Sequence, residues 1–250
     1  MTPRATTAAA VGASAAVLGA AYWRHLSPSA QQLGRFPSRS ARTHDERGRP
    51  LLALTFDDGP QEPFTSQVAE LLERRGLRGT FFQVGRCVER HPRVTAALAA
   101  AGHVVGNHSY GHRFERGWTE PAVRAEVLAA QDVLGEVLGR RPLLYRPPWL
   151  IRTPATYRVL DELGLEPVSG RFCHPLEPLQ PRSTWMAGWA DALVARPGQI
   201  VIFHDGYDDK GADRSQTVAA LDLLLDRWQA EGYAFTTVDE LLGLPAYDAA

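Results

Sequence analysis

The fold of this chain is decided at residues 51–60, which read LLALTFDDGP. Residues 51–56 form a short apolar run, and two carboxylates, Asp57 and Asp58, follow it directly before a Gly-Pro turn. An apolar run that is closed by turn residues is typical of a buried strand. The sequence therefore predicts a first strand whose carboxyl end carries two adjacent acids.

From this strand to residue 245, strand-like apolar runs alternate seven times with segments of helical periodicity. Consecutive parallel strands need a crossover between them, usually a helix, so this order predicts one parallel sheet. The pattern favours an α/β fold, a deformed (β/α) barrel of about seven parallel strands. The predicted strands are 51–56, 79–84, 103–108, 143–146, 165–169, 199–203 and 234–238, and the predicted helices are 65–75, 93–101, 120–138, 154–163, 185–196, 217–231 and 239–242.

Composition excludes several classes of protein. The chain has 250 residues, 44% of them hydrophobic and 22% charged, which is typical of a globular protein and not of a disordered chain. It has 27 basic and 28 acidic residues and a net charge of −1, so the composition does not indicate a basic surface for nucleic acid. No Gly-x-Gly-x-x-Gly follows the first strand and no Gly-x-x-x-x-Gly-Lys occurs, which excludes dinucleotide and P-loop nucleotide sites.

Composition also divides the chain into three parts. Residues 1–26 contain an uncharged run, Ala8 to Trp23, that suits a signal peptide or a single membrane anchor. Residues 27–49 are rich in Ser, Pro, Arg and Gln and predict a linker. Residues 50–245 are the predicted folded domain. We therefore expect an exported protein, extracytoplasmic or membrane-anchored, in a bacterial cell envelope; the sequence carries no signal for an oligomeric state.

Polar clusters follow four of the predicted strands. In a parallel α/β barrel the loops after the carboxyl ends of the strands lie on one face and build the active site. Four clusters that are far apart in sequence would therefore meet on one rim. The clusters are DD at 57–58, HSYGH at 108–112, RPPW at 146–149 and HDG at 204–206.

One carboxylate and two histidines of this rim predict a divalent metal site. Asp58 would supply the carboxylate, and His108 and His112, four residues apart, the imidazoles. Three protein ligands leave one coordination position open, which is characteristic of catalytic sites and not of structural ones. Asn107 precedes the first histidine and is a candidate partner that would orient it.

The other charged residues of the rim suit proton transfer. Asp57 is free to act as a base on water beside the metal. His204 follows a different strand and can protonate a leaving amine or alcohol. Arg146 can hold a carboxylate with two hydrogen bonds and keep it ionised.

These segments resemble four of the five motifs of the NodB-type polysaccharide deacetylases, carbohydrate esterase family four. The matching segments are TFDDGP at 55–60, HSYGH at 108–112, RPPW at 146–149 and IFHD at 202–205, and the similarity extends over about residues 50–245. The resemblance implies a deformed (β/α) barrel that removes N-acetyl groups, less often O-acetyl groups, from sugar polymers. It also implies a bound divalent metal, usually Zn²⁺ or Co²⁺.

The resemblance further implies a role for each matched residue. By position in the motifs, Asp57 would be the catalytic base and Arg146 the residue that orients it. The metal ligands would be Asp58, His108 and His112. The backbone N–H of Trp149 would donate a hydrogen bond to the oxyanion, and His204 would be the general acid.

The chain departs from the family pattern at two places. Residues 149–150 read Trp-Leu where the third motif commonly has Tyr or Phe and then Gly. The fourth motif, an Asp-x-x-Asp-Trp-like segment, is not recognisable, and SGRFCHPLE at 169–177 stands in its place. Because the Asp of that motif usually supports the catalytic His or Arg, another group must position His204. Glu177 and Asp205 are the candidates, and Glu177 is preferred because it lies in the replacement segment after the fifth strand, on the same rim.

Loops on the same face also carry aromatic side chains, which can stack on the apolar faces of sugar rings. Tyr110, Trp118 and Tyr207 are the candidates for such a substrate groove. The charged loop that contains Asp208 and Lys210 is predicted to be a solvated turn.

The sequence leaves three functions open. The first is metal-dependent hydrolysis of N-acetyl groups on a glycan, peptidoglycan or chitin-like, with release of acetate. The second keeps the chemistry but changes the substrate to a lipid-linked sugar or a small amide, as a deacetylase or deformylase. The third is a carbohydrate-binding protein without turnover, against which the complete metal trio and the retained Asp57 and His204 argue. In each case the expected partner is a glycan or small amide and not a nucleic acid.

Overall fold

The computed structural model describes residues 19–20, 35–208 and 210–249. Its described strands form one sheet with the order β5-β4-β3-β2-β1-β7-β6, and β8 pairs with the first residues of β1. Every pairing between these strands is parallel. The strands are β1 (Leu51–Asp57), β2 (Thr80–Gln83), β3 (Val104–Asn107), β4 (Leu144–Tyr145), β5 (Glu166–Pro167), β6 (Arg171–Phe172), β7 (Gln199–His204) and β8 (Ala234–Thr236).

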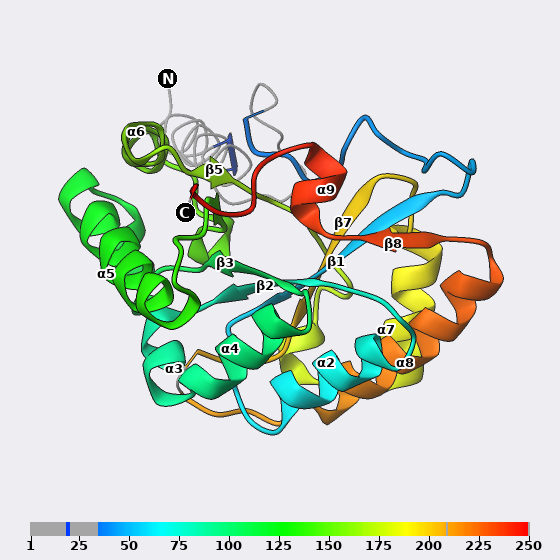
Figure 1. The fold of residues 1–250 in the computed structure, drawn as a ribbon. Coiled ribbons are helices and arrows are strands. Elements are labelled where there is room, and N and C mark those ends of the chain that lie inside the picture. Colours follow the sequence, from blue (N-terminus) through cyan, green and yellow to red (C-terminus); the bar gives the residue numbers. More distant parts are fainter. Residues whose placement is uncertain (1–18, 21–34, 209, 250) are drawn as a thin grey trace, which may run out of the picture.

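Helices cover the outside of the curled sheet, and Figure 1 shows α2, α4, α7 and α8 along one side of it. The helices are α2 (Phe64–Glu73), α3 (Gly85–Arg90), α4 (Pro92–Ala100), α5 (Glu120–Leu138), α6 (Pro154–Leu163), α7 (Ser183–Trp189), α8 (Ser215–Ala230) and α9 (Val238–Leu242). Short helical turns are η1 (Phe114–Gly117), η2 (Pro148–Leu150), η3 (Glu177–Leu179) and a π-helical turn η4 (Ala190–Val194). Among the described residues no helix combines the length and the hydrophobicity that crossing a bilayer requires.

The predicted parallel α/β barrel is confirmed. All seven predicted strands and seven predicted helices are present, with ends that shift by a few residues. Strand β6 and helix α3, two and six residues long, were not predicted, because such short elements show no periodicity in the sequence. The predicted helix 185–196 is interrupted, since α7 passes into the π-helical turn η4.

Helix α6 shows how local sequence sets an element. The Thr153 hydroxyl accepts a hydrogen bond from the backbone N–H of Thr156, and Pro154 occupies the first turn, where no N–H partner is needed. The helix ends at Gly164, whose φ of 66° is the left-handed conformation that glycine adopts without strain.

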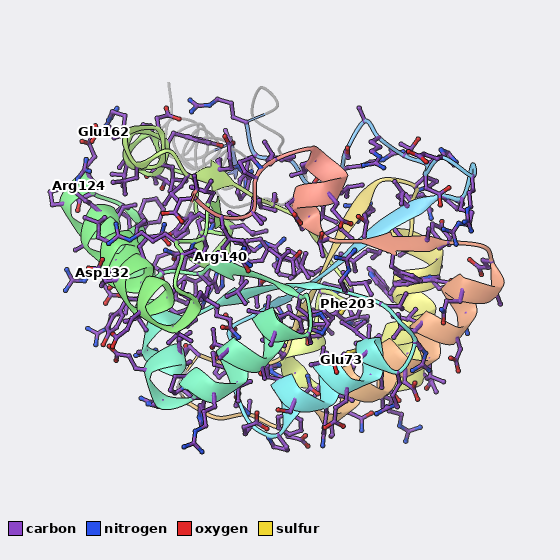
Figure 2. The ribbon with its side chains drawn as sticks, viewed as in Figure 1. Glu73, Arg124, Asp132, Arg140, Glu162 and Phe203 are labelled. Carbon is purple, nitrogen blue, oxygen red and sulfur yellow. The ribbon has the colours of Figure 1, made fainter. Side chains whose placement is uncertain are left out.

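The core lies between the sheet and the helices that cover it. Strand β1 is buried along its whole length, which explains why its sequence is apolar without alternation. The ring of Phe56 stacks against Phe81 and Phe203, with centroids 4.8 and 5.8 Å apart. Figure 2 shows Phe203 inside the molecule, whereas Arg124 and Glu162, which form an ion pair between α5 and α6, lie at its edge.

An N-terminal strap, residues 35–49, packs on the barrel beside the edge strands. Phe36 is buried against Leu150 and Ile202. The backbone of the strap forms hydrogen bonds with the barrel at two places. Ser169 N–H, after β5, donates to Pro37 O at 3.0 Å, and Ile200 N–H, in β7, donates to Ser38 O at 3.1 Å.

The folded unit therefore begins before residue 50, the predicted domain start, and takes in part of the predicted linker, 27–49. This packing could not be predicted from the sequence, because the strap is held through backbone hydrogen bonds and one buried aromatic ring and has no hydrophobic periodicity. The segment predicted as signal peptide or anchor, 1–26, lies outside the described residues except for 19–20.

Candidate active site

The four polar clusters meet at the carboxyl ends of the strands, as predicted from the loop rule. Asp57 ends β1 and His204 ends β7, and the two residues are paired in register on these neighbouring strands. They line a solvent-open cleft of about 660 Å³. The cleft is lined by Asp57, Asp58, His108, His112, Pro147, Trp149, Leu150, Phe172, Pro178, His204, Tyr207, Asp208, Lys210 and Arg214.

Asp58, His108 and His112 lie together at the floor of this cleft. The Oδ1 atom of Asp58 is 3.3 Å from Nε2 of His108 and 3.2 Å from Nε2 of His112. The three potential ligand atoms all lie within 4.8 Å of one another. All three side chains are at least nine-tenths buried.

The donor set fits a divalent cation. Asp58 Oδ1 is buried and has no hydrogen-bond donor, an arrangement that is costly for a carboxylate unless a cation compensates it. Burial opposes the charge on Asp58, but the neighbouring charges of His112 and His108 hold the pKa of this carboxyl well below its usual range. The site is thus built to keep the carboxylate ionised, and two imidazoles with one carboxylate suit zinc and related metals.

The backbone fixes which nitrogen His108 presents. Its Nδ1 lies 2.6 Å from the carbonyl oxygen of Arg146, which can only accept, so Nδ1 carries a proton and Nε2 is the nitrogen that faces Asp58. Asn107 contributes indirectly, because its Oδ1 accepts from Ser109 N–H at 2.8 Å and its Nδ2 donates to Val127 O at 3.1 Å. Asn107 therefore fixes the loop that carries both histidines and does not contact either ring.

Asp57 is held by a buried arginine. Nη1 of Arg146 donates to Asp57 Oδ1 and to Thr55 Oγ1, both at 2.7 Å, and Nη2 donates to Ser169 O at 2.9 Å. The guanidinium is fully buried, with its Cζ 4.1 Å from the centroid of the Phe82 ring. Thr55 was not among the predicted site residues, although it lies two positions before Asp57 and so on the same face of the strand.

His204 is supported by Glu177. Its Nδ1 lies 2.6 Å from Glu177 Oε2, and the other oxygen, Oε1, accepts from Thr217 Oγ1 at 2.6 Å. Burial disfavours the charged ring, but Glu177 raises the pKa of His204 to about 9. Burial also disfavours the carboxylate, yet His204 and then Arg214 and Thr217 lower the pKa of Glu177. The pair is therefore an imidazolium against a carboxylate, with Nδ1–H donating.

Comparison with known proteins agrees with this geometry. The sequence model of the family "Polysaccharide deacetylase" matches residues 44–168. A peptidoglycan-N-acetylglucosamine deacetylase of Bacillus cereus is 34% identical over 198 residues, which cover 77% of this chain and 88% of that protein. A chitooligosaccharide deacetylase of Azorhizobium caulinodans is 32% identical over 196 residues, 72% of this chain and 89% of that protein.

The chain belongs to the polysaccharide deacetylase family. The resemblance inferred from the motifs is thereby confirmed. A solved structure of a family 4 acetyl xylan esterase from Clostridium thermocellum, in complex with a cobalt ion, superposes on this deacetylase with a TM-score of 0.68. It is 28% identical in sequence and covers 78% of this chain and 93% of that one.

Asp205, the other carboxylate considered for His204, has a different partner in the deacetylase. Its Oδ2 accepts from Thr65 Oγ1 at 2.5 Å, and burial raises its pKa to about 7. The carboxylate lies directly against Gly59, where any side chain would collide with it. A Cβ on Gly206 would likewise lie 2.6 Å from the backbone oxygen of Asp58. Asp205 thus fixes the turn after β1, and glycine is required because the two turns touch.

Left-handed backbone is concentrated around the cleft. Asp58, His112, Trp149, Leu150 and Asp208 all line it and have φ between 41° and 74°. Such conformations cost free energy in residues other than glycine, and they occur where the surroundings enforce them, often at functional sites. The ring of Trp149 packs 4.2 Å from that of His112, centroid to centroid, so its half-exposed indole covers one ligand of the trio.

The predicted aromatic residues of the groove separate into two groups. Tyr207 lines the cleft and is 41% exposed. Tyr110 instead donates to Glu89 Oε2 at 2.9 Å and does not line the cleft. Trp118 packs on Phe114 with ring centroids 5.6 Å apart, also outside the cleft lining.

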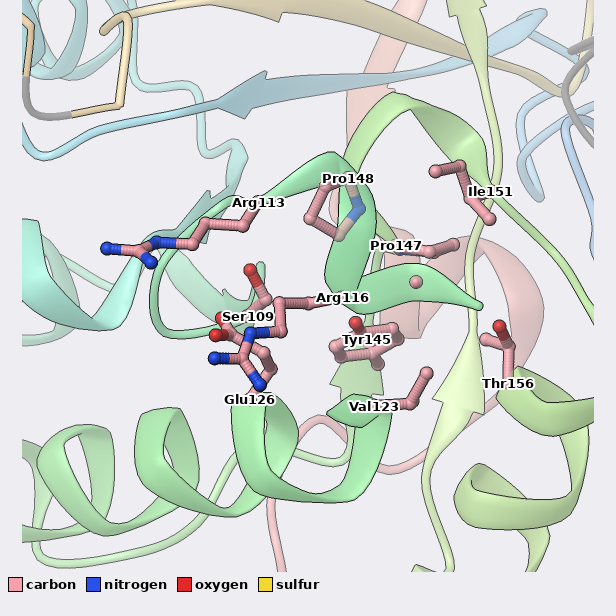
Figure 3. A pocket seen from close by; sticks show the side chains of 11 residues that line it. Ser109, Arg113, Arg116, Val123, Glu126, Tyr145, Pro147, Pro148, Ile151 and Thr156 are labelled. Atoms are coloured by element: carbon pink, nitrogen blue, oxygen red, sulfur yellow. The ribbon is translucent and has the colours of Figure 1, made fainter. Parts of the chain in front are cut away.

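A second hollow of the deacetylase, with about 320 Å³ of free space, lies behind the loop that follows His112. Figure 3 shows Arg116, Glu126 and Tyr145 facing it. None of the predicted site residues lines this hollow. Glu126 accepts a hydrogen bond from Gly111 N–H at 2.6 Å, so its role in the structure is to hold the loop between the two histidines.

Proposed function

We propose that this chain hydrolyses the N-acetyl group of a glycan, peptidoglycan or chitin-like, and releases acetate. The observation that carries the proposal is the cleft in which Asp57 and His204 stand side by side, in register, next to the Asp58, His108 and His112 trio. The relatives named above act on substrates of this class according to their names, and the family resemblance implies a metal.

Asp58, His108 and His112 would hold the metal, which we propose is Zn²⁺, with Co²⁺ as a substitute. When bound, the cation supplies Lewis-acid polarisation of the acetyl carbonyl. Zinc accepts one carboxylate and two imidazoles and leaves room for a further ligand. The backbone N–H of Trp149 is proposed as a donor to the developing oxyanion.

The protein's own residues divide the proton transfers. Asp57 takes a proton from the attacking water, and Arg146 holds the Asp57 carboxylate in place through the 2.7 Å hydrogen bond. His204 then gives a proton from Nε2 to the leaving amine nitrogen, since Nδ1 is engaged by Glu177. The protonated His204 that this step needs is the form that Glu177 stabilises.

Acetate release from N-acetylated glycan, measured with and without a chelator, tests this function. We expect the parent protein to release acetate, chelation to stop it, and Zn²⁺ or Co²⁺ to restore it. Acetate release that persists in the fully chelated protein would refute the metal site. Bound metal without acetate or formate from peptidoglycan, chitin oligomers or lipid-linked sugars would refute the hydrolase.

We further propose that residues 50–245, together with the strap, form the catalytic domain of an exported protein and that residues 1–26 direct or anchor it. The uncharged run from Ala8 to Trp23 supports export. Fractionation of cells that produce the full chain tests this proposal, because an intracellular soluble pool alone would contradict it.

A further inference from the structure

Asp208 is a buried carboxylate in a loop for which the sequence predicted a solvated turn. That prediction is wrong for this residue, because Asp208 is only 4% exposed. Its φ of 41° places its backbone in the left-handed region, which favours Gly, Asn and Asp. The loop after β7 therefore turns the Asp208 side chain inward, toward the cleft.

Three residues hold Asp208 in this position. Nη2 of Arg86, in α3, donates to its Oδ1 at 3.2 Å. Nζ of Lys210 lies 3.4 Å from its Oδ2, and Sγ of Cys87 donates to its backbone oxygen at 3.0 Å. Two cations around a buried carboxylate offset the cost of removing its charge from water. Asp208 is thus held by contacts that reach it from α3 and from its own loop.

The same carboxylate faces the second histidine of the metal trio. Asp208 Oδ2 lies 3.5 Å from Nδ1 of His112, and that nitrogen is buried without a hydrogen-bond partner. The other ring nitrogen of His112 is the one next to Asp58. The imidazole therefore stands between two carboxylates, one on each nitrogen. His108 has the corresponding arrangement with a neutral acceptor, the carbonyl of Arg146, at its Nδ1.

We propose that Asp208 is a positioning residue for His112, an inference that rests on the proposed metal site. A carboxylate at Nδ1 keeps the proton on that nitrogen, which leaves Nε2 as the ligand atom and makes it more basic. It also places a further carboxylate, in addition to those of Asp57 and Asp58, next to the trio. No sequence motif predicts this role for Asp208, because the residue comes close to His112 only in the folded loop.

Metal affinity measured by competition with a chromophoric chelator tests the proposal without relying on turnover. Asp208→Asn keeps an acceptor oxygen but removes the charge, and Asp208→Leu removes both. We expect Co²⁺ and Zn²⁺ to bind about 10- to 100-fold more weakly to Asp208→Leu, with Asp208→Asn between this variant and the parent. The absorption spectrum of bound Co²⁺ should shift in both variants, because the environment of one ligand changes.

Asp213→Asn is the matched control. This acid lies in the same loop, but its carboxylate is exposed and accepts from Ser215 N–H, so its loss should leave metal affinity within about twofold of the parent. Parent-like affinity and Co²⁺ spectrum in Asp208→Asn would overturn the proposal, and this isosteric variant decides the question if Asp208→Leu does not fold. Absence of metal binding in the parent itself would overturn the metal site, and this inference with it.

Discussion

Replacing Glu177 by glutamine removes one negative charge beside His204 while it keeps an acceptor oxygen close to Nδ1. The distance from Glu177 Oε2 to that nitrogen is 2.6 Å, and the carboxylate is buried, so water cannot take over its electrostatic effect. We expect the variant to fold, because glutamine has nearly the same shape. We also expect it to lose activity at alkaline pH.

The size of the loss follows from the pKa of His204, which is raised to about 9 in the parent. Glu177 contributes most of the upward shift, and Asp58 and Asp57 act in the same direction. Without the Glu177 charge, the pKa of His204 falls toward the ordinary value of about 6.5. The protonated fraction then falls by about 30-fold at pH 8 but by less than about twofold at pH 6.

The assay is the pH profile of kcat/KM for acetate release, which reports the ionisations of the free enzyme. The acid must be protonated to act, so the alkaline limb of the parent is lost as pH rises through the pKa of His204. In Glu177→Gln this limb moves to lower pH by up to about 2.5 units. Both proteins are compared fully loaded with metal, so that any cation beside Asp58 affects them equally.

Asp205→Asn serves as the control, because Asp205 contacts Thr65 and not His204. Its alkaline limb should stay close to that of the parent. Profiles of Glu177→Gln and the parent that superimpose above pH 7 would refute the assignment of Glu177 as the group that keeps His204 protonated.

The remaining predictions concern the trio, the base and the strap. His112→Ala should retain its fold but no metal after dialysis, as metal analysis and circular dichroism would show; stoichiometric metal in this variant would contradict the ligand assignment. Asp57→Asn should keep its metal and lose about 10²- to 10⁴-fold in kcat, whereas Asp58→Asn should bind metal more weakly; metal titrations in the opposite order would exchange the two roles. Phe36→Ala should lower the free energy of unfolding in urea by about 3–5 kcal/mol, because it empties a buried aromatic site, and a change below about 1 kcal/mol would mean that the strap is not part of the folded unit.

The fold and the rim of the site were predictable because they depend on local patterns. Strand β1 is apolar along its length and ends in two acids, so both its burial and the place of Asp57 could be inferred from residues 51–60. Helix α5 was predicted with its observed bounds, since nineteen residues carry enough periodicity. The parallel order then placed residues from four loops on one face without any knowledge of their contacts.

The partners of these residues were predictable only in part. Glu177 was preferred to Asp205 because it lies in the segment that replaces the fourth motif, on the same rim as His204, but the sequence did not show the contact itself. The choice depends on the turn η3, three residues long, which directs Glu177 toward β7. The role of Asp208 was not predicted, because its burial depends on Arg86, more than a hundred positions earlier. It also depends on a left-handed backbone conformation, which the presence of an Asp does not by itself predict.

The N-terminal strap limits the distance between the cleft and any point before the strap at which the chain is anchored. If the flexible linker extended to Pro50, all of its residues would add to the distance that the domain can reach. Because the chain is bound to the barrel from Phe36 onward, the fifteen residues from there to Pro50 give no reach, and a fully extended segment of that length would span about 50 Å. Phe36, near the start of the strap, packs against Leu150, which lines the cleft. The first residues of the strap and the wall of the cleft therefore belong to the same packed unit. In an anchored form of this protein, inserting residues before Phe36 would therefore extend its range, whereas inserting them between Phe36 and Ser40 would disrupt the backbone hydrogen bonds that hold the strap on the barrel.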